Sequence, residues 1–200
     1  MKNILIISSH TDDAELGMGG TIHKLAQDNY IWHIVLSLAQ ISNPNHDTKV
    51  EWFKSNTNLG VKNKSTYEIP TREFYKHQSY IGEILTTAKR SFEPQIVFTH
   101  DSVDRHQDHK VTHEMTTRVF KNVDLYGYHL PWNSTEKKLN CISEISQDNL
   151  NAKIKSLSYY ESQSKKPYFD PDYIRAMATI SSIHFGLSER LQILNKILYL

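Results

Sequence analysis

The chain has 200 residues, of which 38% are hydrophobic and 22% charged, and its formal net charge is +1. A chain of this size and composition is long enough for one sizeable core, so we expect a single domain covering residues 1–200. The small net charge excludes a global field that would attract nucleic acid or an anionic membrane. The neighbouring Lys165 and Lys166 are interpreted as part of a solvated surface.

Cysteine content and hydropathy favour the cytoplasm. Cys141 is the only cysteine, so no disulfide can form within the chain, and a reducing compartment is the simplest interpretation. The apolar run at 4–7 is too short for the core of a signal peptide, and no later apolar stretch reaches the length that spans a membrane. We therefore expect a cytoplasmic protein without a transmembrane segment.

Strand-like and helix-like runs alternate along the chain. In chain order we predict a strand at 3–8, a helix at 15–28, a strand at 32–38, a loop at 40–49, a helix at 50–59, a weaker strand at 65–69, a helix at 73–92, a strand at 94–100, a helix at 106–120, strands at 125–130 and 141–145, and a largely helical remainder. This alternation predicts an α/β protein with a Rossmann-like, mostly parallel sheet covered by helices on both faces. The ligand site of such a sheet lies beyond the carboxyl ends of its strands.

Two polar clusters follow predicted strands. SSHTDDAELGMGG comes directly after the first strand, and THDSVDRHQDH lies at the end of the fourth. Carboxylates crowded this closely are costly unless a positive charge lies among them, and a metal ion is the simplest candidate. The candidate ligands are His10 and Asp13 in the first cluster and His106, Asp108 and His109 in the second. Two histidines and one carboxylate are the usual protein ligands of a hydrolytic zinc site, so these residues could supply such a set.

Neighbouring side chains within each cluster can have different roles, one binding a metal ion and the other acting on water or on an imidazole. Adjacent Asp12 and Asp13 point in different directions, so one can hold a metal while the other faces bound water. If the second cluster forms one helical turn, His106 and His109 share a face. Asp108 then points elsewhere and suits the orientation of an imidazole.

Each cluster also has a plain structural interpretation. Asp12 can merely cap the helix that begins beside it, with Glu15 in the first turn, and a HxxH pair is common on helix surfaces. Gly17, Gly19 and Gly20 suggest a phosphate-binding loop, but GMGG lacks the GxGxxG spacing and the nearby acids would repel a pyrophosphate. We expect these glycines to let the helix pack closely on the sheet.

The segments HTDDAELGMGGTI and PQIVFTHDSVDRHQDH together resemble the two signatures of the PIG-L/LmbE family of metal-dependent de-N-acetylases, written AHPDDE and HxDH. The segments LGV and RAMATISSIHFGLSERL extend the resemblance to most of the chain. The resemblance implies an LmbE-like fold and a Zn²⁺ or other divalent metal ion bound by His10, Asp13 and His109. Thr11 replaces the family's proline and Ala14 is inserted before the glutamate, and neither is an implied ligand.

The resemblance also implies the catalytic residues. Asp12 matches the general base, and His106 matches the group that stabilises the tetrahedral intermediate and can act as an acid. Asp108 would support His106. Arg72, in the segment PTREF, resembles an arginine that family members use near the substrate.

Further side chains are candidates for the surroundings of the site. Arg105 is, with Arg72, a candidate for substrate binding, and Asp104 beside it can brace the site. His100 and His184 can either reach the pocket or pack in the structure. Three aromatic residues can form either core and loop or a stacking wall for a sugar ring: Tyr126, Tyr128 and Trp132.

The expected function is zinc-dependent hydrolysis of the N-acetyl group of an amino sugar such as N-acetylglucosamine. The sugar is free, nucleotide-linked or lipid-linked, and a role in surface glycan biosynthesis would fit. The alternatives are a metallo-amidase acting on another small amide, such as a thiol conjugate, and a metal-bound sugar-binding protein without turnover. We expect a small-molecule partner and no nucleic acid, and we leave room for a homo-oligomer.

Overall fold

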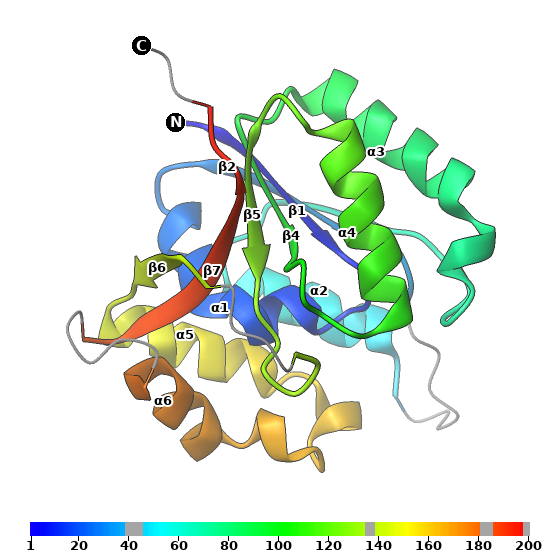
Figure 1. The fold of residues 1–200 in the computed structure, drawn as a ribbon. Coiled ribbons are helices and arrows are strands. Elements are labelled where there is room, and N and C mark those ends of the chain that lie inside the picture. The colour runs from blue at the N-terminus through cyan, green and yellow to red at the C-terminus, as the bar shows by residue number, and fades with distance from the viewer. Residues whose placement is uncertain (39–45, 135–138, 181–185, 198–200) are drawn as a thin grey trace.

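The computed structural model describes residues 1–38, 46–134, 139–180 and 186–197 (Figure 1). Most of the loop predicted at 40–49 lies outside these ranges, and so does His184. Among the described residues, no helix is both long enough and apolar enough to cross a membrane.

The centre of the structure is a sheet whose strands follow the order β3-β2-β1-β4-β5-β7-β6. The strands are β1 (Asn3–Ser8), β2 (Tyr30–Val35), β3 (Asn63–Thr66), β4 (Ile96–His100), β5 (Asp124–Tyr128), β6 (Cys141–Glu144) and β7 (Ser188–Asn195). The first five pair in parallel, and β7 lies antiparallel between β5 and β6. This confirms the predicted mixed α/β fold with a mostly parallel sheet.

Helices cover both faces of the sheet. They are α1 (Asp13–Ala26), α2 (Thr48–Asn58), α3 (Gln78–Phe92), α4 (Gln107–Val119), α5 (Gln147–Leu157) and α6 (Pro171–Ile180), with short 3-10 helices at η1 (Phe74–Lys76), η2 (Glu161–Gln163) and η3 (Pro167–Phe169). Figure 1 shows α3 and α4 on one face, α1, α2 and α5 on the other, and α6 packed outside α5.

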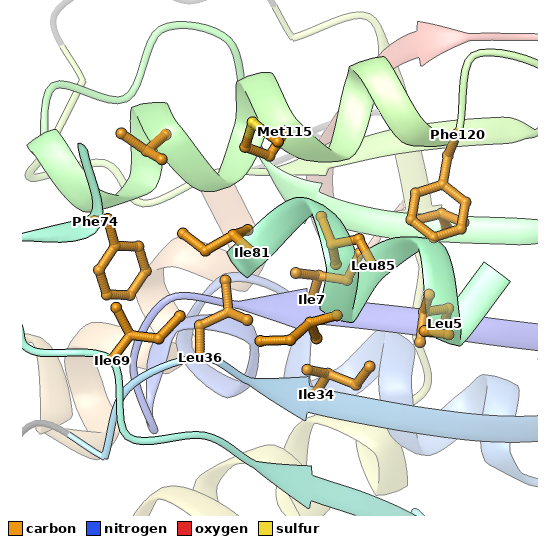
Figure 2. Close-up of a cluster of buried hydrophobic side chains, with 14 of the residues drawn as sticks. Leu5, Ile7, Ile34, Leu36, Ile69, Phe74, Ile81, Leu85, Met115 and Phe120 are labelled. Carbon is orange, nitrogen blue, oxygen red and sulfur yellow. The ribbon is translucent and has the colours of Figure 1, made fainter. Parts of the chain in front are cut away.

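Successive residues of β1 face opposite helical layers, because side chains alternate along a strand. Leu5 and Ile7 enter the core under α3 and α4, where Figure 2 shows them beside Ile81 and Leu85. Ile4 and Ile6 pack on the other face, in the cluster that α1 joins. A strand buried on both faces reads as a continuous apolar run, which explains the sequence NILIIS.

The prediction of a largely helical remainder after residue 145 is confirmed for α5 and α6 but missed the strand β7, which follows α6. Its sequence, SERLQILN, lacks a strong strand pattern, and two of its polar residues, Ser188 and Glu189, are buried. Pairing with β5 and β6 determines this strand, and such context decides β structure more than intrinsic preference does.

The glycines of α1 permit two close approaches. A Cβ on Gly17 would lie 2.7 Å from Cδ2 of Tyr128 in β5, so the expected close packing of this helix on the sheet is confirmed. The helix also breaks at Met18, which has φ −150° and ψ 30°. Beyond the break, the Gly20 N–H donates to the buried carboxylate of Glu189 at 3.1 Å.

Candidate functional site

The two polar clusters meet at the carboxyl ends of β1 and β4. These two strands are neighbours in the sheet. From β1 the chain continues to β2 and β3 on one side, and it then returns to β4 on the other side, so the strand order reverses between β1 and β4. The chain after β1 carries His10 to Asp13 into the start of α1. The chain after β4 carries His106 to His109 into the start of α4. Neighbouring strand ends in a parallel sheet therefore bring the two segments together, as predicted.

The three predicted ligand residues lie at similar distances from one another, with Asp13 presenting a different carboxylate oxygen to each histidine. Nδ1 of His10 lies 3.2 Å from Nε2 of His109 and 3.4 Å from Oδ2 of Asp13. Nε2 of His109 lies 3.4 Å from Oδ1 of Asp13. Ligand atoms bound at about 2.0–2.1 Å to a tetrahedral ion are separated by roughly 3.3 Å. The donor set and its spacing therefore fit a divalent metal ion such as Zn²⁺.

The other ring nitrogen of each histidine contacts a carboxylate. Nε2 of His10 lies 3.2 Å from Oδ2 of Asp108, and Nδ1 of His109 lies 2.8 Å from Oδ2 of Asp104. A proton held on that nitrogen leaves Nδ1 of His10 and Nε2 of His109 free to bind an ion. Carboxylates fix metal-binding imidazoles in this way in many proteins.

The electrostatics at this point favour positive charge. Burial lowers the pKa of His10, but hydrogen bonds to Asp108 and Asp13 outweigh it and raise the pKa to about 10. Burial alone would raise the pKa of Asp13. The charge of His109 and the hydrogen bond to His10 outweigh burial, so the pKa of Asp13 lies below its usual value. The same surroundings that hold a proton here would stabilise a bound cation.

His100 also lies beside these residues. Its ring stacks on that of His109 with the centroids 3.8 Å apart, and its Nε2 is 3.5 Å from Oδ2 of Asp13. However, the backbone N–H of Ser9 donates to this nitrogen at 3.1 Å, which occupies its lone pair. His100 is fully buried and packs behind His109, and with Asp13 and His109 it forms a second group of side chains that could hold a metal ion.

Asp12 is half-buried at the start of α1. It occupies the N-cap position, but its side chain makes no capping hydrogen bond, so the plain capping interpretation does not describe it. Its carboxylate lines a cavity instead. Burial, together with the charge of Asp13, raises the pKa of Asp12 to about 6, while the charge of Lys166 acts in the opposite direction.

The expectation that His106 and His109 share one helical turn is wrong. Helix α4 begins at Gln107, and His106 is its N-cap residue with extended backbone. Nδ1 of His106 accepts the backbone N–H of Asp108 at 3.2 Å, so the proton of the neutral ring resides on Nε2. The ring lies 4.3 Å from that of His109, centroid to centroid, and lines the same cavity as Asp12.

The expected support of His106 by the Asp108 carboxylate is also wrong. Oδ2 of Asp108 contacts His10 and accepts the backbone N–H of Arg72 at 2.7 Å. The reason is geometric: His106 precedes the helix, whereas Asp108 projects from its first turn toward the end of β1. The hydrogen bond between Asp108 and His106 comes from the Asp108 backbone N–H.

A cavity of about 510 Å³ opens over these side chains. It is lined by His10, Thr11, Asp12, Asp13, Leu16, Thr48, Thr71, Arg72, His106, His109, Trp132, Asn133, Gln163, Lys166 and Tyr168. Arg72, predicted from its segment to bind substrate, is one of these lining residues. Its backbone is in the left-handed region, with φ +69°, which is unusual for a residue other than glycine.

Arg105, the second arginine predicted to bind substrate, does not line this cavity. It is exposed, and its backbone N–H donates to the Asn133 carbonyl at 3.0 Å. The structure therefore does not place Arg105 for the predicted role.

The predicted aromatic wall has different members. Tyr128 is fully buried, with its hydroxyl donating to the Ile7 carbonyl, and Tyr126 does not line the cavity. Trp132 does line it, and its ring stacks on Tyr168 with the centroids 4.1 Å apart and the planes 10° from parallel.

Tyr168 and Lys166 were missed because they lie far along the chain from both clusters. Lys166 lines the cavity and does not belong merely to a solvated surface, which corrects the interpretation of that pair. The only signal for either residue was the aromatic and proline-rich segment after the lysines, KKPYFDP.

Comparison with known proteins identifies the family and the fold. Residues 5–120 match the family described as PIG-L, GlcNAc-PI de-N-acetylase. The structure is similar to that of a zinc-inhibited form of a teicoplanin deacetylase, with a TM-score of 0.79 and 17% identity over 94% of this chain and 96% of that one.

Two further solved structures share the fold. The N,N'-diacetylchitobiose deacetylase of Pyrococcus horikoshii has a TM-score of 0.78 and 20% identity, over 96% of this chain and 84% of that one. The 4-carboxy-2-hydroxymuconate hydratase GalB of Pseudomonas putida has a TM-score of 0.76 and 14% identity, over 100% and 98%. Because the last of these is a hydratase, the fold alone does not decide the reaction. The family match spans both polar clusters and more than half of the chain, and this protein therefore belongs to the PIG-L family of de-N-acetylases.

Proposed function

We propose that this hydrolytic N-deacetylase removes the acetyl group from an amino sugar or sugar conjugate, and that it does so with a divalent metal ion, Zn²⁺ in the simplest case. The observation that carries the proposal is the set of nearly equal distances among Nδ1 of His10, the Asp13 carboxylate and Nε2 of His109. Both histidines are fixed from behind by carboxylates, and the set opens into a cavity large enough for a sugar.

His10, Asp13 and His109 would hold the ion. When bound, it would lower the pKa of a water molecule and polarise the carbonyl oxygen of the amide. Asp12 is the proposed general base, because its carboxylate is free of capping bonds and lies in the cavity beside the ligands. Its raised pKa, about 6, brings it closer to the range that suits proton transfer near neutral pH.

His106 is the proposed donor to the carbonyl oxygen. Because its Nδ1 accepts the Asp108 backbone N–H, its Nε2 carries a proton that can stabilise the negative charge developing on that oxygen. A neutral ring held in this way is poorly suited to give up that proton as an acid. We therefore assign the return of a proton to the leaving amine to Asp12, which has taken it from the water.

The remainder of the cavity is the proposed sugar site. Arg72 and the stacked pair of Trp132 and Tyr168 line it, and an aromatic face or edge suits the apolar side of a sugar ring. The sugar can be free, nucleotide-linked or lipid-linked, and the proposal includes a cytoplasmic enzyme that contributes to a surface glycan. The related solved deacetylases named above act on teicoplanin and on N,N'-diacetylchitobiose, as their names state.

A substrate panel tests this proposal. The metal-loaded protein is incubated with free, nucleotide-linked and lipid-linked N-acetyl sugars, with acetyl-lysine peptides and with small amide thiol conjugates, and released acetate is measured. We expect acetate from at least one N-acetylhexosamine derivative and little from the peptides. Equal release from sugars and the other amides would favour a general metallo-amidase. Sugar binding without any acetate release would favour a binding protein.

Metal dependence is tested on the same samples. Elemental analysis should find about one divalent ion per chain, and a chelator should abolish acetate release and lower the Tm, because the ligands come together only in the folded chain. Full activity after verified removal of the metal would contradict the proposal.

A further inference from the structure

We propose that the rim of this cavity recognises an anionic substituent, a phosphate or a carboxylate, on the sugar substrate, and that Lys166 and Arg72 bind it. This inference rests on the proposed function and specifies the class of sugar. Three observations support it. Both cationic residues line the same cavity, backbone hydrogen bonds hold the segment that carries each of them, and the acidic residues that line the cavity are confined to the proposed metal centre.

The position of Arg72 is built into the fold. Its backbone N–H donates to Oδ2 of Asp108 at 2.7 Å, and its carbonyl accepts Nε2 of Gln107 at 3.1 Å. Both partners belong to the first turn of α4. The left-handed backbone of Arg72 costs energy for a residue with a side chain, and these two bonds keep it in place. The loop thus holds an arginine where its guanidinium can reach the cavity mouth.

Lys166 is held by a separate segment. Its backbone N–H donates to the Gln163 carbonyl at 2.9 Å, and its own carbonyl accepts the N–H of Phe169 at 3.0 Å. Phe169 is buried, which anchors the turn. Nζ of Lys166 lies 5.6 Å from the centre of the Tyr168 ring, the aromatic residue that stacks on Trp132. The ammonium group is therefore presented at the aromatic side of the cavity.

The carboxylates that line the cavity lie on its floor. Asp12 and Asp13 are the acidic lining residues among those the structure describes, and both serve the proposed metal centre. Within the same described residues, neither Arg72 nor Lys166 forms an ion pair with a carboxylate. A neutral sugar would offer neither cation an anionic partner, whereas a phosphate or carboxylate would form charge-assisted hydrogen bonds with them.

Kinetics on three substrates with the same sugar test the inference. They are N-acetylglucosamine 1-phosphate, 2-carboxyethyl N-acetylglucosaminide and the neutral methyl N-acetylglucosaminide. We expect kcat/KM for at least one anionic substrate to exceed that for the methyl glycoside by about tenfold or more, the effect of one charge-assisted contact. The preference should shrink at high salt. The anionic substrate that shows the larger preference tells whether the site binds a phosphate or a carboxylate.

Two neighbouring lysines provide a matched pair of variants. Lys166→Met should reduce the ratio of kcat/KM between the anionic substrate and the methyl glycoside by about tenfold, mainly through the KM for the anionic substrate. Lys165→Met, an exposed neighbour that does not line the cavity, should keep the wild-type preference. Equal kcat/KM for all three substrates in the wild type would overturn the inference. So would a Lys166→Met variant that slows all three alike, since Lys166 would then act only on Asp12.

A binding measurement separates this inference from the proposed function. Glucosamine 1-phosphate and methyl glucosaminide, which have no acetyl group to lose, are titrated into the metal-loaded protein by calorimetry. We expect the phosphate compound to bind about tenfold more tightly, and Lys166→Met to remove the difference. If no acetyl sugar is hydrolysed but this difference is found, the proposed function fails and the anion site stands. Equal binding of the two compounds, with hydrolysis intact, would refute the anion site alone.

Discussion

The backbone N–H of Arg72 donates to Oδ2 of Asp108, and this single oxygen also contacts Nε2 of His10. One carboxylate therefore joins the loop at the cavity mouth to an imidazole of the proposed metal centre. Asp108 is 1% exposed, so its charge is screened little by water and both contacts are strengthened. The position of Arg72 and the orientation of His10 are coupled through this residue.

Loss of the Asp108 charge should weaken metal binding. We expect Asp108→Asn to reduce Zn²⁺ affinity by about 10- to 100-fold, because the carboxylate that orients His10 is replaced by a neutral amide. Competition with a chromophoric chelator measures the affinity. Asp148→Asn is the matched control, since Asp148 lies in the first turn of α5 and is exposed. Unchanged affinity in Asp108→Asn would show that His10 needs no such support.

Substitution of Asp12 and of His109 should separate catalysis from metal binding. Asp12→Asn should keep nearly normal metal content and lose about a hundredfold or more in kcat, the scale expected for a general base. His109→Ala should lose the metal, because it removes one of three proposed ligands. Elemental analysis and acetate release measure the two effects. The opposite result, with metal lost in Asp12→Asn and kept in His109→Ala, would mean that the roles are assigned incorrectly.

The buried pair of Lys153 and Glu189 should be important for stability. Nζ of Lys153 lies 2.7 Å from Oε1 of Glu189, whose carboxylate also accepts the N–H groups of Gly20 and Thr21. Glu189→Gln leaves the lysine buried without its partner, and we expect a loss of about 3–5 kcal/mol in the free energy of unfolding.

Urea unfolding measures this loss. The double variant Lys153→Met with Glu189→Gln should lose less than the sum of the two single variants, because removing both charges leaves neither uncompensated. A loss below about 1 kcal/mol in Glu189→Gln alone would contradict a structural role for the pair.

His33 should make the protein less stable in mild acid. Its ring is fully buried, with Nε2 2.8 Å from Oγ of Ser8 and Nδ1 2.7 Å from Oδ1 of Asn56. Burial lowers the pKa of His33 from 6.5 to about 4, although the bond to Asn56 and the charge of Asp13 oppose this. Between these values the unfolded chain takes up a proton that the folded chain does not. This contribution to stability is therefore present above pH 6.5 and is lost as the pH falls toward 4.

The pH dependence of two variants gives the measurement. Between pH 7 and pH 5, His33 should account for a loss of about 2 kcal/mol in the free energy of unfolding. Over this pH range the free energy of unfolding of the wild type should therefore fall by about 2 kcal/mol more than that of His33→Gln, in which the other titrating groups are unchanged. Parallel pH profiles for the two proteins would show that His33 is not held in its neutral form.

Local sequence determined the main elements of the fold. The run NILIIS is apolar on both faces, and it forms the central strand β1, as predicted. The positions of the two polar clusters at strand ends were sufficient to bring His10, Asp13 and His109 together, because neighbouring parallel strands end at the same edge of the sheet. Strand β7 was not predictable in this way, since its buried Glu189 finds its partners in α1 and α5.

The amino-acid sequence by itself determined which residues could hold a metal ion, and on which edge of the sheet. Only the tertiary structure decided that the Asp108 carboxylate contacts His10, and that Arg105 does not line the cavity. Only the tertiary structure brought Lys166 to the same cavity as Asp12. The physical reason is that periodicity encodes which face of an element is buried, a property of adjacent residues. The partner of a polar side chain depends instead on its direction and on segments that fold back from far along the chain.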